Sequence, residues 1–316
     1  MKILFGVFNW GLGHAMRSTP LINALLNEGH QVDIISTGRA LGLLRTKFQD
    51  NCGYFDIPEP AAPKNYGTLQ VLSETYRILS ELKQAQKATA KLVGSYDRVI
   101  SDCRFDVVGD REKSFLVNHQ LRFVVPPYEF FTSAFLAYFM NRFSHIIVPD
   151  FPDRILTGRI STNPFYRGKI DLIGTISNLK KRDLTQDVDY FVSISGPEPV
   201  RSMIETKLLN LARQLKGRVV VTLGNPRQTQ HRFDGNVEIH SFLTTTQQEE
   251  MMNRAKHVIC NAGYTTIMEL IELEKNAQVI PTPNQPEQTF LAHRFRTIHA
   301  PWKTKQSIKN FLKVVL

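Results

Sequence analysis

A histidine that directly follows a glycine turn is the residue of this sequence best placed to do chemistry. The segment Gly11-Leu12-Gly13-His14 joins an apolar, β-prone stretch to a stretch with helical spacing, so it lies where a strand gives way to a helix. The positive end of the helix dipole disfavours a charged imidazole, so we expect His14 to be neutral and able to accept a proton. Asp102 ends another predicted strand and is expected to hold His14 in one tautomer. The alternative interpretation is that His14 only caps the helix and Asp102 only ends a strand, without a catalytic role.

A second strand, glycine turn and helix occur in the C-terminal half, over Cys260–Glu269. Gly263 lies in the turn, and the amide groups of the following helix suit a diphosphate, with a hydroxyl added by Thr265 or Thr266. Glu269 is acidic in an otherwise apolar turn, where its carboxylate can accept hydrogen bonds from a ribose diol. These residues predict a binding site for a nucleoside diphosphate.

The loop after the next predicted strand, Pro283–Gln288, is polar and bounded by prolines. A Glu287 carboxylate accepts hydrogen bonds, and the Gln288 amide both donates and accepts them. Both side chains are therefore suited to the hydroxyls of a sugar.

Two other classes of site are disfavoured by what the sequence lacks. A dinucleotide fingerprint would have a third glycine where Met16 stands, and an acid at the end of the second strand, where residues 35–38 carry none. The triplet Asp187–Asp189 matches a metal-binding Asp-x-Asp pattern, but it precedes a strand and is interpreted as solvated surface. The nine histidines are scattered and the cysteines are unpaired, so we expect no metal site.

The apolar patterning around these turns predicts two β-α series. The first comprises strand Ile3–Phe8, helix Ser18–Asn27, strand Gln31–Ser36, helix Leu69–Leu92, strand Arg98–Ser101, short strands Ser114–Val117 and Phe123–Val125, helix Phe130–Phe143 and strand His145–Val148. The second comprises strand Tyr190–Ser195, helix Val200–Leu215, strands Arg218–Leu223 and Glu238–Phe242, helix Thr246–Arg254, strand His257–Cys260, helix Thr265–Leu273, strand Gln278–Ile280 and the basic helix Ser307–Val315.

These series predict an α/β protein with two doubly wound, Rossmann-like domains that face each other across a cleft. The stretch Pro149–Asn178 is rich in Pro, Gly, Asn and Ser and has no clear periodicity. We therefore expect the domains to comprise residues 1–160 and 161–316.

Composition narrows the class of protein. The chain has 316 residues, of which 42% are hydrophobic and 22% charged, which is typical of a globular protein. The N-terminus lacks a signal-peptide core, no apolar run is long enough to span a bilayer, and the three cysteines form no disulfide framework, so we expect a cytoplasmic protein. The net charge of +10 fits an anionic partner such as a diphosphate, an acidic glycan or a lipid phosphate.

The aromatic-rich helix Phe130–Phe143 has two interpretations. The first is a buried or half-buried helix of the core. The second is a surface that contacts an acceptor or the inner face of the membrane. The proline-rich segment Glu59–Thr68 is the other expected part of an acceptor surface.

The two turns together carry a resemblance to a known family. Gly-Leu-Gly-His in the first half, and Cys-Asn-Ala-Gly-Tyr-Thr-Thr-Ile-Met-Glu with Pro-Glu-Gln in the second, resemble the GT-B glycosyltransferases. The branch it looks most similar to contains the peptidoglycan N-acetylglucosaminyltransferase and the UDP-glucuronosyltransferases. The resemblance implies that His14 activates the acceptor hydroxyl with Asp102 in support, and that the base edge lies near Phe242. The donor-binding residues so implied are Gly13, Ser195, Gly196, Arg201, Phe242, Gly263, Thr265, Thr266, Glu269, Glu287 and Gln288.

One stretch departs from the pattern of that family. Such enzymes often have a glycine- or serine-rich loop after the first strand of the second domain, whereas this chain has Ser195-Gly196-Pro197-Glu198-Pro199. The two prolines remove two N–H donors, so Ser195, Gly196 and Arg201 would have to compensate, and Glu198 would repel a phosphate unless it faces elsewhere.

The sequence thus predicts a metal-independent, inverting transferase that takes a sugar from a nucleotide-diphosphate sugar, with uridine as the base by analogy. The donor is a co-substrate, and no further cofactor and no nucleic-acid partner are expected. Two alternatives stay open. Gly13–Arg17 also resembles the Gly-His-x-Met-Arg turn of a nucleotide-sugar hydrolase, in which water would be the acceptor. A non-catalytic protein that binds a sugar nucleotide is the other.

Overall fold

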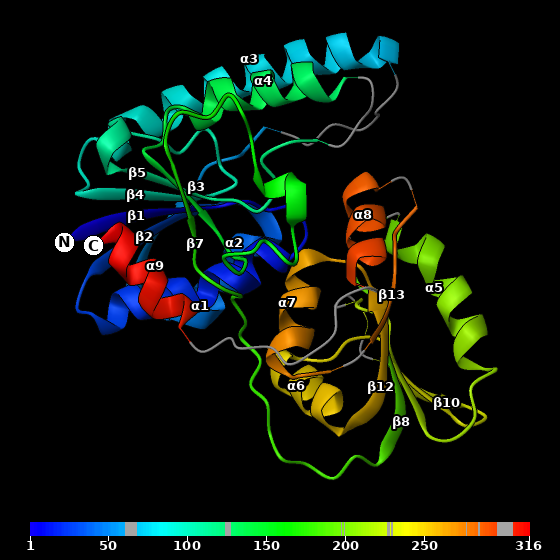
Figure 1. Ribbon diagram of the computed structural model, residues 1–316. Helices are drawn as coiled ribbons and strands as arrows, with labels where there is room; N and C mark the ends of the chain where they lie inside the picture. Colours follow the sequence, from blue (N-terminus) through cyan, green and yellow to red (C-terminus); the bar gives the residue numbers. More distant parts are fainter. Residues whose placement is uncertain are drawn as a thin grey trace. The chain divides into compact units, whose positions relative to one another are not determined.

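The chain divides into two compact units (Figure 1). The computed structural model describes residues 1–60, 68–123, 128–196, 198, 200–225, 228, 230–275, 277–283, 285–295 and 306–316. The first unit comprises Met1–Gly174 and Gln306–Leu316, and the second comprises Thr175–Lys305.

The first unit is built on a seven-stranded parallel sheet with the strand order β3-β2-β1-β4-β5-β6-β7. Leu4, Ile35, Val99, Leu116 and Ile146 all point to one face of the sheet, where Val93 and Met140 of the covering helices belong to the same core. Buried side chains on the opposite face include Phe5, Ile34, Ile100 and Phe115. The strands are β1 (Lys2–Val7), β2 (Gln31–Ser36), β3 (Cys52–Asp56), β4 (Arg98–Asp102), β5 (Ser114–Val117), β6 (His145–Val148) and β7 (Lys169–Leu172).

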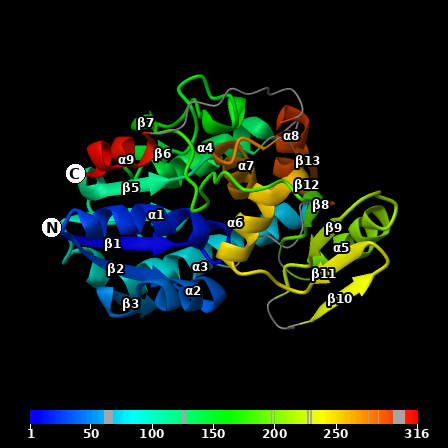
Figure 2. The ribbon, with the colours of Figure 1, turned by 90° about the horizontal axis from the view of Figure 1, so that it is seen from below.

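Helices cover both faces of this first sheet, α3 and α4 on one and α1, α2 and α9 on the other (Figures 1 and 2). They are α1 (Gly13–Asn27), α2 (Gly38–Phe48), α3 (Thr68–Val93), α4 (Glu129–Met140) and α9 (Ser307–Val315), with short 3-10 turns at Gln49–Asn51, Arg111–Lys113 and Gly158–Ser161. The first unit is therefore a doubly wound α/β domain.

The second unit has a six-stranded sheet with the order β10-β11-β9-β8-β12-β13, parallel except for the antiparallel pair β10 and β11. Its strands are β8 (Val188–Ser193), β9 (Val219–Thr222), β10 (His231–Asp234), β11 (Val237–His240), β12 (Ala255–Asn261) and β13 (Ala277–Ile280). Its helices are α5 (Val200–Ala212), α6 (Thr245–Arg254), α7 (Tyr264–Glu272) and α8 (Pro286–Phe295).

The units divide at a different point from the expected boundary at residues 160/161. Strand β7 pairs in parallel with β6, and this ladder keeps the chain in the first unit as far as Gly174. The C-terminal helix α9 then returns to the first unit, where it packs on α1 and β6. Both effects depend on contacts distant in sequence, which the local composition does not report.

Most predicted strands and helices occur within a few residues of their expected bounds. Among the described helices and strands, five were not predicted, namely α2, β3, β7, β10 and α8. Helix α8 begins at Pro286, so Glu287 and Gln288 lie in its first turn and not in the expected loop. Helix α1 begins five residues earlier than expected, at Gly13, so the histidine lies inside its first turn. The expected strand Phe123–Val125 falls largely outside the described residues, as do residues 61–67 of the expected acceptor segment.

Candidate active site

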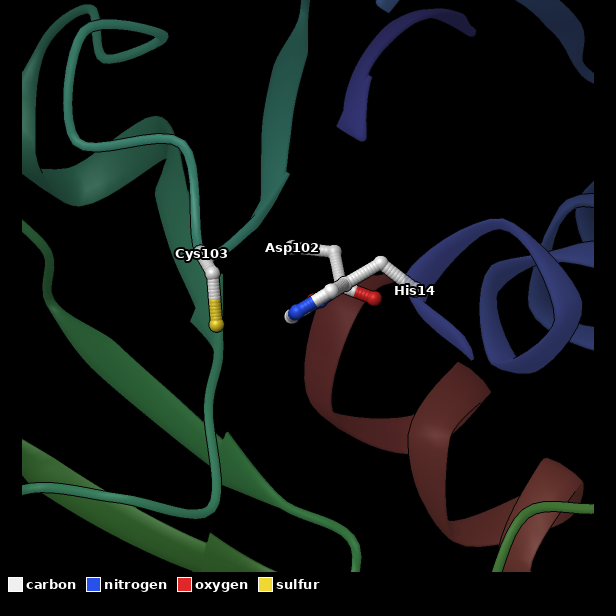
Figure 3. Close-up of side chains that lie close together, drawn as sticks. All are labelled: His14, Asp102 and Cys103. Carbon is white, nitrogen blue, oxygen red and sulfur yellow. The ribbon is translucent and has the colours of Figure 1, made fainter. Parts of the chain in front are cut away.

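His14 and Asp102 come together at the carboxyl ends of two neighbouring strands (Figure 3). Val7, at the end of β1, pairs with Asp102 at the end of β4, and His14 is the second residue of the helix that follows β1. The Nδ1 atom of His14 lies 2.8 Å from Oδ1 of Asp102. The two side chains are therefore in contact, as the sequence predicted.

Two further side chains of α1 complete the surroundings of the Asp102 carboxylate, which is fully buried. Arg17 donates to both carboxylate oxygens, with its Nε 2.8 Å from Oδ2, and the Ser18 hydroxyl donates to Oδ2 at 2.8 Å. Neither residue was assigned a role from the sequence. Their spacing could have indicated that they lie near Asp102, because residues three and four positions after His14 share its face of the helix.

The charges around His14 determine which of its ring nitrogens carries the proton. Arg17 and His14 hold the pKa of the Asp102 carboxyl well below its usual range, so this group only accepts hydrogen bonds. Nδ1 of His14 lies closer to the Asp102 oxygen, at 2.8 Å, than to Nη2 of Arg17, at 3.0 Å, and that Nη2 also donates to Asp102. We therefore assign Nδ1 as the donor to Asp102, which leaves the lone pair of Nε2 as the acceptor. Burial and the neighbouring Arg17 guanidinium lower the pKa of His14 below 6.5, although Asp102 opposes them. A neutral imidazole with Nε2 as an acceptor is the form that can take up a proton.

Cys103 lies beside this pair and raises the question of a metal ion (Figure 3). The ligand atoms of His14, Asp102 and Cys103 all lie within 4.8 Å of one another. However, Nη2 of Arg17 donates to Asp102 and lies 3.0 Å from Nδ1 of His14 and 3.4 Å from Sγ of Cys103. The guanidinium therefore takes the position that a cation would need, and the group as arranged does not fit a metal.

Hydrogen bonds connect the glycine turn before α1 to the segment after β3. Both carboxylate oxygens of Glu59 accept from the backbone N–H of Asn9, at 2.8 and 3.0 Å. The Asn9 side chain accepts from the N–H of Ala40, and Gly11 has the left-handed φ of 69° that favours glycine. Burial raises the pKa of Glu59 to about 7, with Arg104 acting against it. The start of the expected acceptor segment is thus tied to the turn that carries His14.

In the second unit, α7 begins at the second glycine turn. Gly263 is the N-cap residue with an ordinary φ of −73°, and its cap position has no side-chain hydrogen bond. A Cβ atom at Gly263 would meet only the Thr266 hydroxyl, at 3.7 Å. Neither backbone conformation nor packing therefore requires a glycine here. Thr265 and Thr266 are in the first turn of α7, as expected.

Glu269 lies one turn further along α7 and is only 5% exposed. Among the described residues, its carboxyl group has no hydrogen-bond partner. Burial raises its pKa to about 8, so at neutral pH the group is largely protonated. A buried carboxyl without a partner is costly for the fold and is suited to a ligand that brings hydrogen-bond donors.

A hydrogen-bond network joins three loops at the carboxyl edge of the second sheet. Asn261 accepts from the N–H of Ser195 at 3.0 Å and donates to the Thr282 hydroxyl at 3.3 Å. The Gln288 side-chain oxygen in turn accepts from the Thr282 N–H at 3.0 Å. The Gln288 amide nitrogen has no acceptor among the residues that the structure describes. Asn261 and Thr282 were missed by the sequence analysis, because only the fold brings them between Ser195 and Gln288.

Arg201 is occupied by its own neighbours. Its guanidinium pairs with the carboxylates of Glu198 and Glu205, donates to the carbonyl oxygen of Leu223 at 2.9 Å, and is only 5% exposed. The expected concern that Glu198 would repel a phosphate is met in part by this pairing. Pro197 and Pro199, which were expected to remove two N–H donors from this loop, lie outside the described residues.

The remaining expected donor residues lie as follows. Gly13 is the first residue of α1 in the first unit. Gly196 follows β8 with a left-handed φ of 127°, and Phe242 follows β11 with its ring 42% exposed. Glu287 is in the first turn of α8. No helix in the described ranges is both long and apolar enough to cross a membrane.

Two family models match the chain, one in each half. The model "Glycosyl transferase family 1" matches residues 1–119, and "Glycosyltransferase family 28 C-terminal domain" matches residues 200–307. An "Uncharacterized glycosyltransferase" of Methanosarcina acetivorans is 25% identical, over 91% of this chain and 81% of that protein.

Solved structures show the same architecture. MurG of Acinetobacter baumannii superposes with a TM-score of 0.54 at 14% identity, over 92% of this chain and 82% of its own. UGT89C1 of Arabidopsis thaliana, in its complex with UDP, superposes with a TM-score of 0.60 at 12% identity, over 99% of this chain and 98% of its own. These two α/β units thus form the GT-B fold. With glycosyltransferase models matching both halves, the chain is a glycosyltransferase of the GT-B class.

Proposed function

We propose that this protein transfers a sugar from a UDP-sugar to an acceptor hydroxyl, with inversion and without a metal ion. The observation that carries the proposal is the His14–Asp102 pair, in which Nδ1 is bonded to a buried carboxylate and Nε2 is left as an acceptor. A general base needs this protonation state near neutral pH.

The proposed reaction is a single displacement. The Nε2 atom of His14 takes the proton of the acceptor hydroxyl while the hydroxyl oxygen attacks the anomeric carbon of the donor. The bond from that carbon to the diphosphate oxygen breaks, and the nucleoside diphosphate leaves with the electron pair. Asp102 is the positioning residue, since it fixes the tautomer and orientation of His14 and stabilises the imidazolium that forms.

We assign the donor to the carboxyl edge of the second sheet. The start of α7 supplies N–H groups and the positive end of a helix dipole for the diphosphate, and the space beside Gly263 allows its close approach. The buried carboxyl of Glu269, for which the described residues offer no hydrogen-bond partner, is the acceptor proposed for the ribose diol. The amide nitrogen of Gln288 and the Glu287 carboxylate are proposed for the sugar. Uridine is the proposed base because the plant relative was solved with UDP.

The test is turnover of UDP-sugars by wild type and by two variants. His14→Ala is expected to lower kcat by about 10²–10⁴-fold while leaving the affinity for UDP nearly unchanged, since it removes only proton transfer. The matched control is His293→Ala, an exposed histidine of α8. A His14→Ala enzyme with wild-type kcat would refute the assignment of the base.

The same assay without an added acceptor separates transfer from the two alternatives. A nucleotide-sugar hydrolase would consume the donor in water alone at its full rate. A non-catalytic sugar-nucleotide-binding protein would bind the donor and release no UDP with any acceptor. The proposed transferase consumes the donor rapidly only when an acceptor hydroxyl is present.

We further propose that the protein is cytoplasmic and that α4 makes peripheral contact with the inner face of the membrane. Four aromatic residues spaced three and four positions apart, Tyr128, Phe131, Phe135 and Tyr138, form an exposed stripe, and Phe131 and Tyr138 are 70% and 72% exposed. Such a stripe can lie in the headgroup region of a bilayer.

Basic residues surround the C-terminal end of this stripe. Arg111 donates to the carbonyl oxygen of Asn141, the Arg167 backbone N–H donates to the Asn141 side chain, and exposed Arg142 follows directly. The wild-type protein is expected to sediment with phosphatidylglycerol-containing vesicles, and the double variant Phe131→Ser/Tyr138→Ser is expected not to. The control is Met203→Ser, an exposed apolar residue of α5. Equal sedimentation of wild type and double variant would refute the membrane contact.

A further inference from the structure

Three side chains with metal-ligating groups converge on the hairpin at the edge of the second sheet. His231 of β10 is directly opposite His240 of β11 in the antiparallel ladder. Glu238 is two residues before His240, so it projects from the same face of the strand. The three residues are fixed to one another by the register of the hairpin.

Their ligand atoms are close to the spacing that a small cation requires. Oε1 of Glu238 lies 3.2 Å from Nε2 of His231 and 2.9 Å from Nε2 of His240, and the ligand atoms of all three lie within 4.8 Å of one another. Around a tetrahedral Zn²⁺ with bonds of about 2.0–2.1 Å, neighbouring ligand atoms lie about 3.3 Å apart. Because the two imidazole planes are nearly parallel, both rings would have to rotate about their side-chain bonds to point Nε2 at one ion, while the backbone register is kept.

Neighbouring groups contact all three ligand residues. The two imidazole rings are stacked, with centroids 4.4 Å apart and planes 13° apart, and Phe233 meets the His231 ring edge-on at 5.1 Å. Arg218 contacts Glu238 through the other carboxylate oxygen, with Nη2 3.4 Å from Oε2. It thereby orients the carboxylate and leaves Oε1 directed at the histidines, as outer groups commonly do at metal sites.

We propose that His231, Glu238 and His240 form a binding site for one divalent transition-metal ion of the zinc type. Two imidazole nitrogens and one carboxylate oxygen favour Zn²⁺ over Mg²⁺ or Ca²⁺, which prefer oxygen ligands. His231 is 50% exposed, whereas Glu238 and His240 are 19% and 21% exposed, so an ion can enter from solvent and keep a water as its fourth ligand.

The site has a structural consequence for the hairpin. The ion would link β10 to β11. Ser241 directly follows β11, and its hydroxyl is hydrogen-bonded to backbone groups of Gln228 and Gln230. Binding to the folded hairpin alone stabilises it by mass action. The site is separate from the residues assigned to catalysis, so its occupancy is not required for the proposed reaction.

The test is zinc titration of a tag-free protein that has been treated with a chelator and desalted. Isothermal titration calorimetry is expected to detect one Zn²⁺ per chain and no binding of Mg²⁺ at the same concentration. His231→Gln and His240→Ala are each expected to weaken zinc binding at least tenfold. His293→Ala and Cys103→Ser, which lie outside the hairpin, are expected to leave it unchanged.

Two results would overturn the proposal. One is a wild-type protein that binds zinc no more tightly than His231→Gln, and the other is loss of binding in Cys103→Ser, which would assign the ion to the His14 cluster. His231 is half exposed, so His231→Gln is expected to fold. Circular dichroism and the melting temperature without metal verify this for each variant.

Discussion

Asp102 is a buried carboxylate at the end of β4. Its carboxylate is fully buried, and ionisation there is compensated by donors from His14, Arg17 and Ser18. Because all three donors are in the first two turns of α1, the conformation of one helix determines the protonation state of the proposed base. A buried charge with this many donors is stable only while they all remain in place.

Removal of Arg17 is expected to destabilise the protein strongly. Arg17→Met leaves the buried Asp102 without its main counter-charge and is expected to lower the free energy of unfolding by about 3–5 kcal/mol. Arg213→Met breaks an exposed pair with Asp234 and is expected to cost about 0–1 kcal/mol. Urea unfolding measures both values. Similar losses in the two variants would show that Asp102 does not depend on Arg17.

Glu269 is expected to make the stability of the protein fall with rising pH. Its pKa is raised from 4.5 to about 8 in the folded state, so the folded protein binds more protons than the unfolded chain between these values. The stabilising protonated form is fully present below pH 4.5 and is lost as the pH rises through 8. The slope is at most about 1.4 kcal/mol per pH unit.

Glu269→Gln tests this expectation, because a glutamine resembles the protonated acid but does not titrate. Its free energy of unfolding relative to wild type is expected to increase steadily from pH 5 to pH 8, while its affinity for UDP falls. Glu250→Gln, at an exposed position of α6, is the control and is expected to show no such trend. A pH-independent difference for Glu269→Gln would show that the carboxyl is ionised in the folded state.

At the scale of elements, both proposed sites use the same arrangement of strand, glycine turn and helix. The turn after β1 leads into α1 with a histidine in the first helical turn, whereas the turn after β12 leads into α7 with two threonines. The carboxyl end of a parallel strand and the start of a helix meet at one edge of each sheet, where ligands of such folds gather. The difference in residue type assigns proton transfer to one edge and phosphate binding to the other.

Gly263→Ala is expected to affect ligand binding far more than stability. The added methyl group meets no protein atom closer than 3.7 Å, but it would occupy the space assigned to the diphosphate. The affinity for UDP is expected to fall at least tenfold. Gly42→Ala, in the interior of α2 with no atom within 4 Å of the added methyl group, is the control and is expected to stabilise the protein by about 0.4–1 kcal/mol. Unchanged UDP affinity in Gly263→Ala would place the diphosphate elsewhere.

At the scale of the whole molecule, a nucleotide that binds the folded state is expected to raise the melting temperature. UDP at about a hundred times its dissociation constant stabilises the folded protein by about 2.7 kcal/mol. We expect this shift for UDP in the presence of EDTA, and a smaller one for ADP. Differential scanning fluorimetry measures it. A shift that requires added Mg²⁺ would contradict the metal-independent donor site.

The sequence by itself determined the α/β class, most helices and strands, and the two glycine turns. These follow from hydrophobic periodicity and from the conformational preferences of glycine, which act over a few neighbouring residues. The same local information singled out His14, Asp102 and Glu269 as candidate site residues, because each stands out by type at the end of a strand or in a helical turn.

Only the tertiary structure decided how these residues are surrounded. Arg17 reaches Asp102 across 85 residues of sequence, and Asn261 joins Ser195 to Thr282 between loops of three different strands. The pairing of β7 and the return of α9 likewise moved the boundary of the first unit. Such contacts depend on strand order and side-chain packing, so they appear only when the whole sheet has formed.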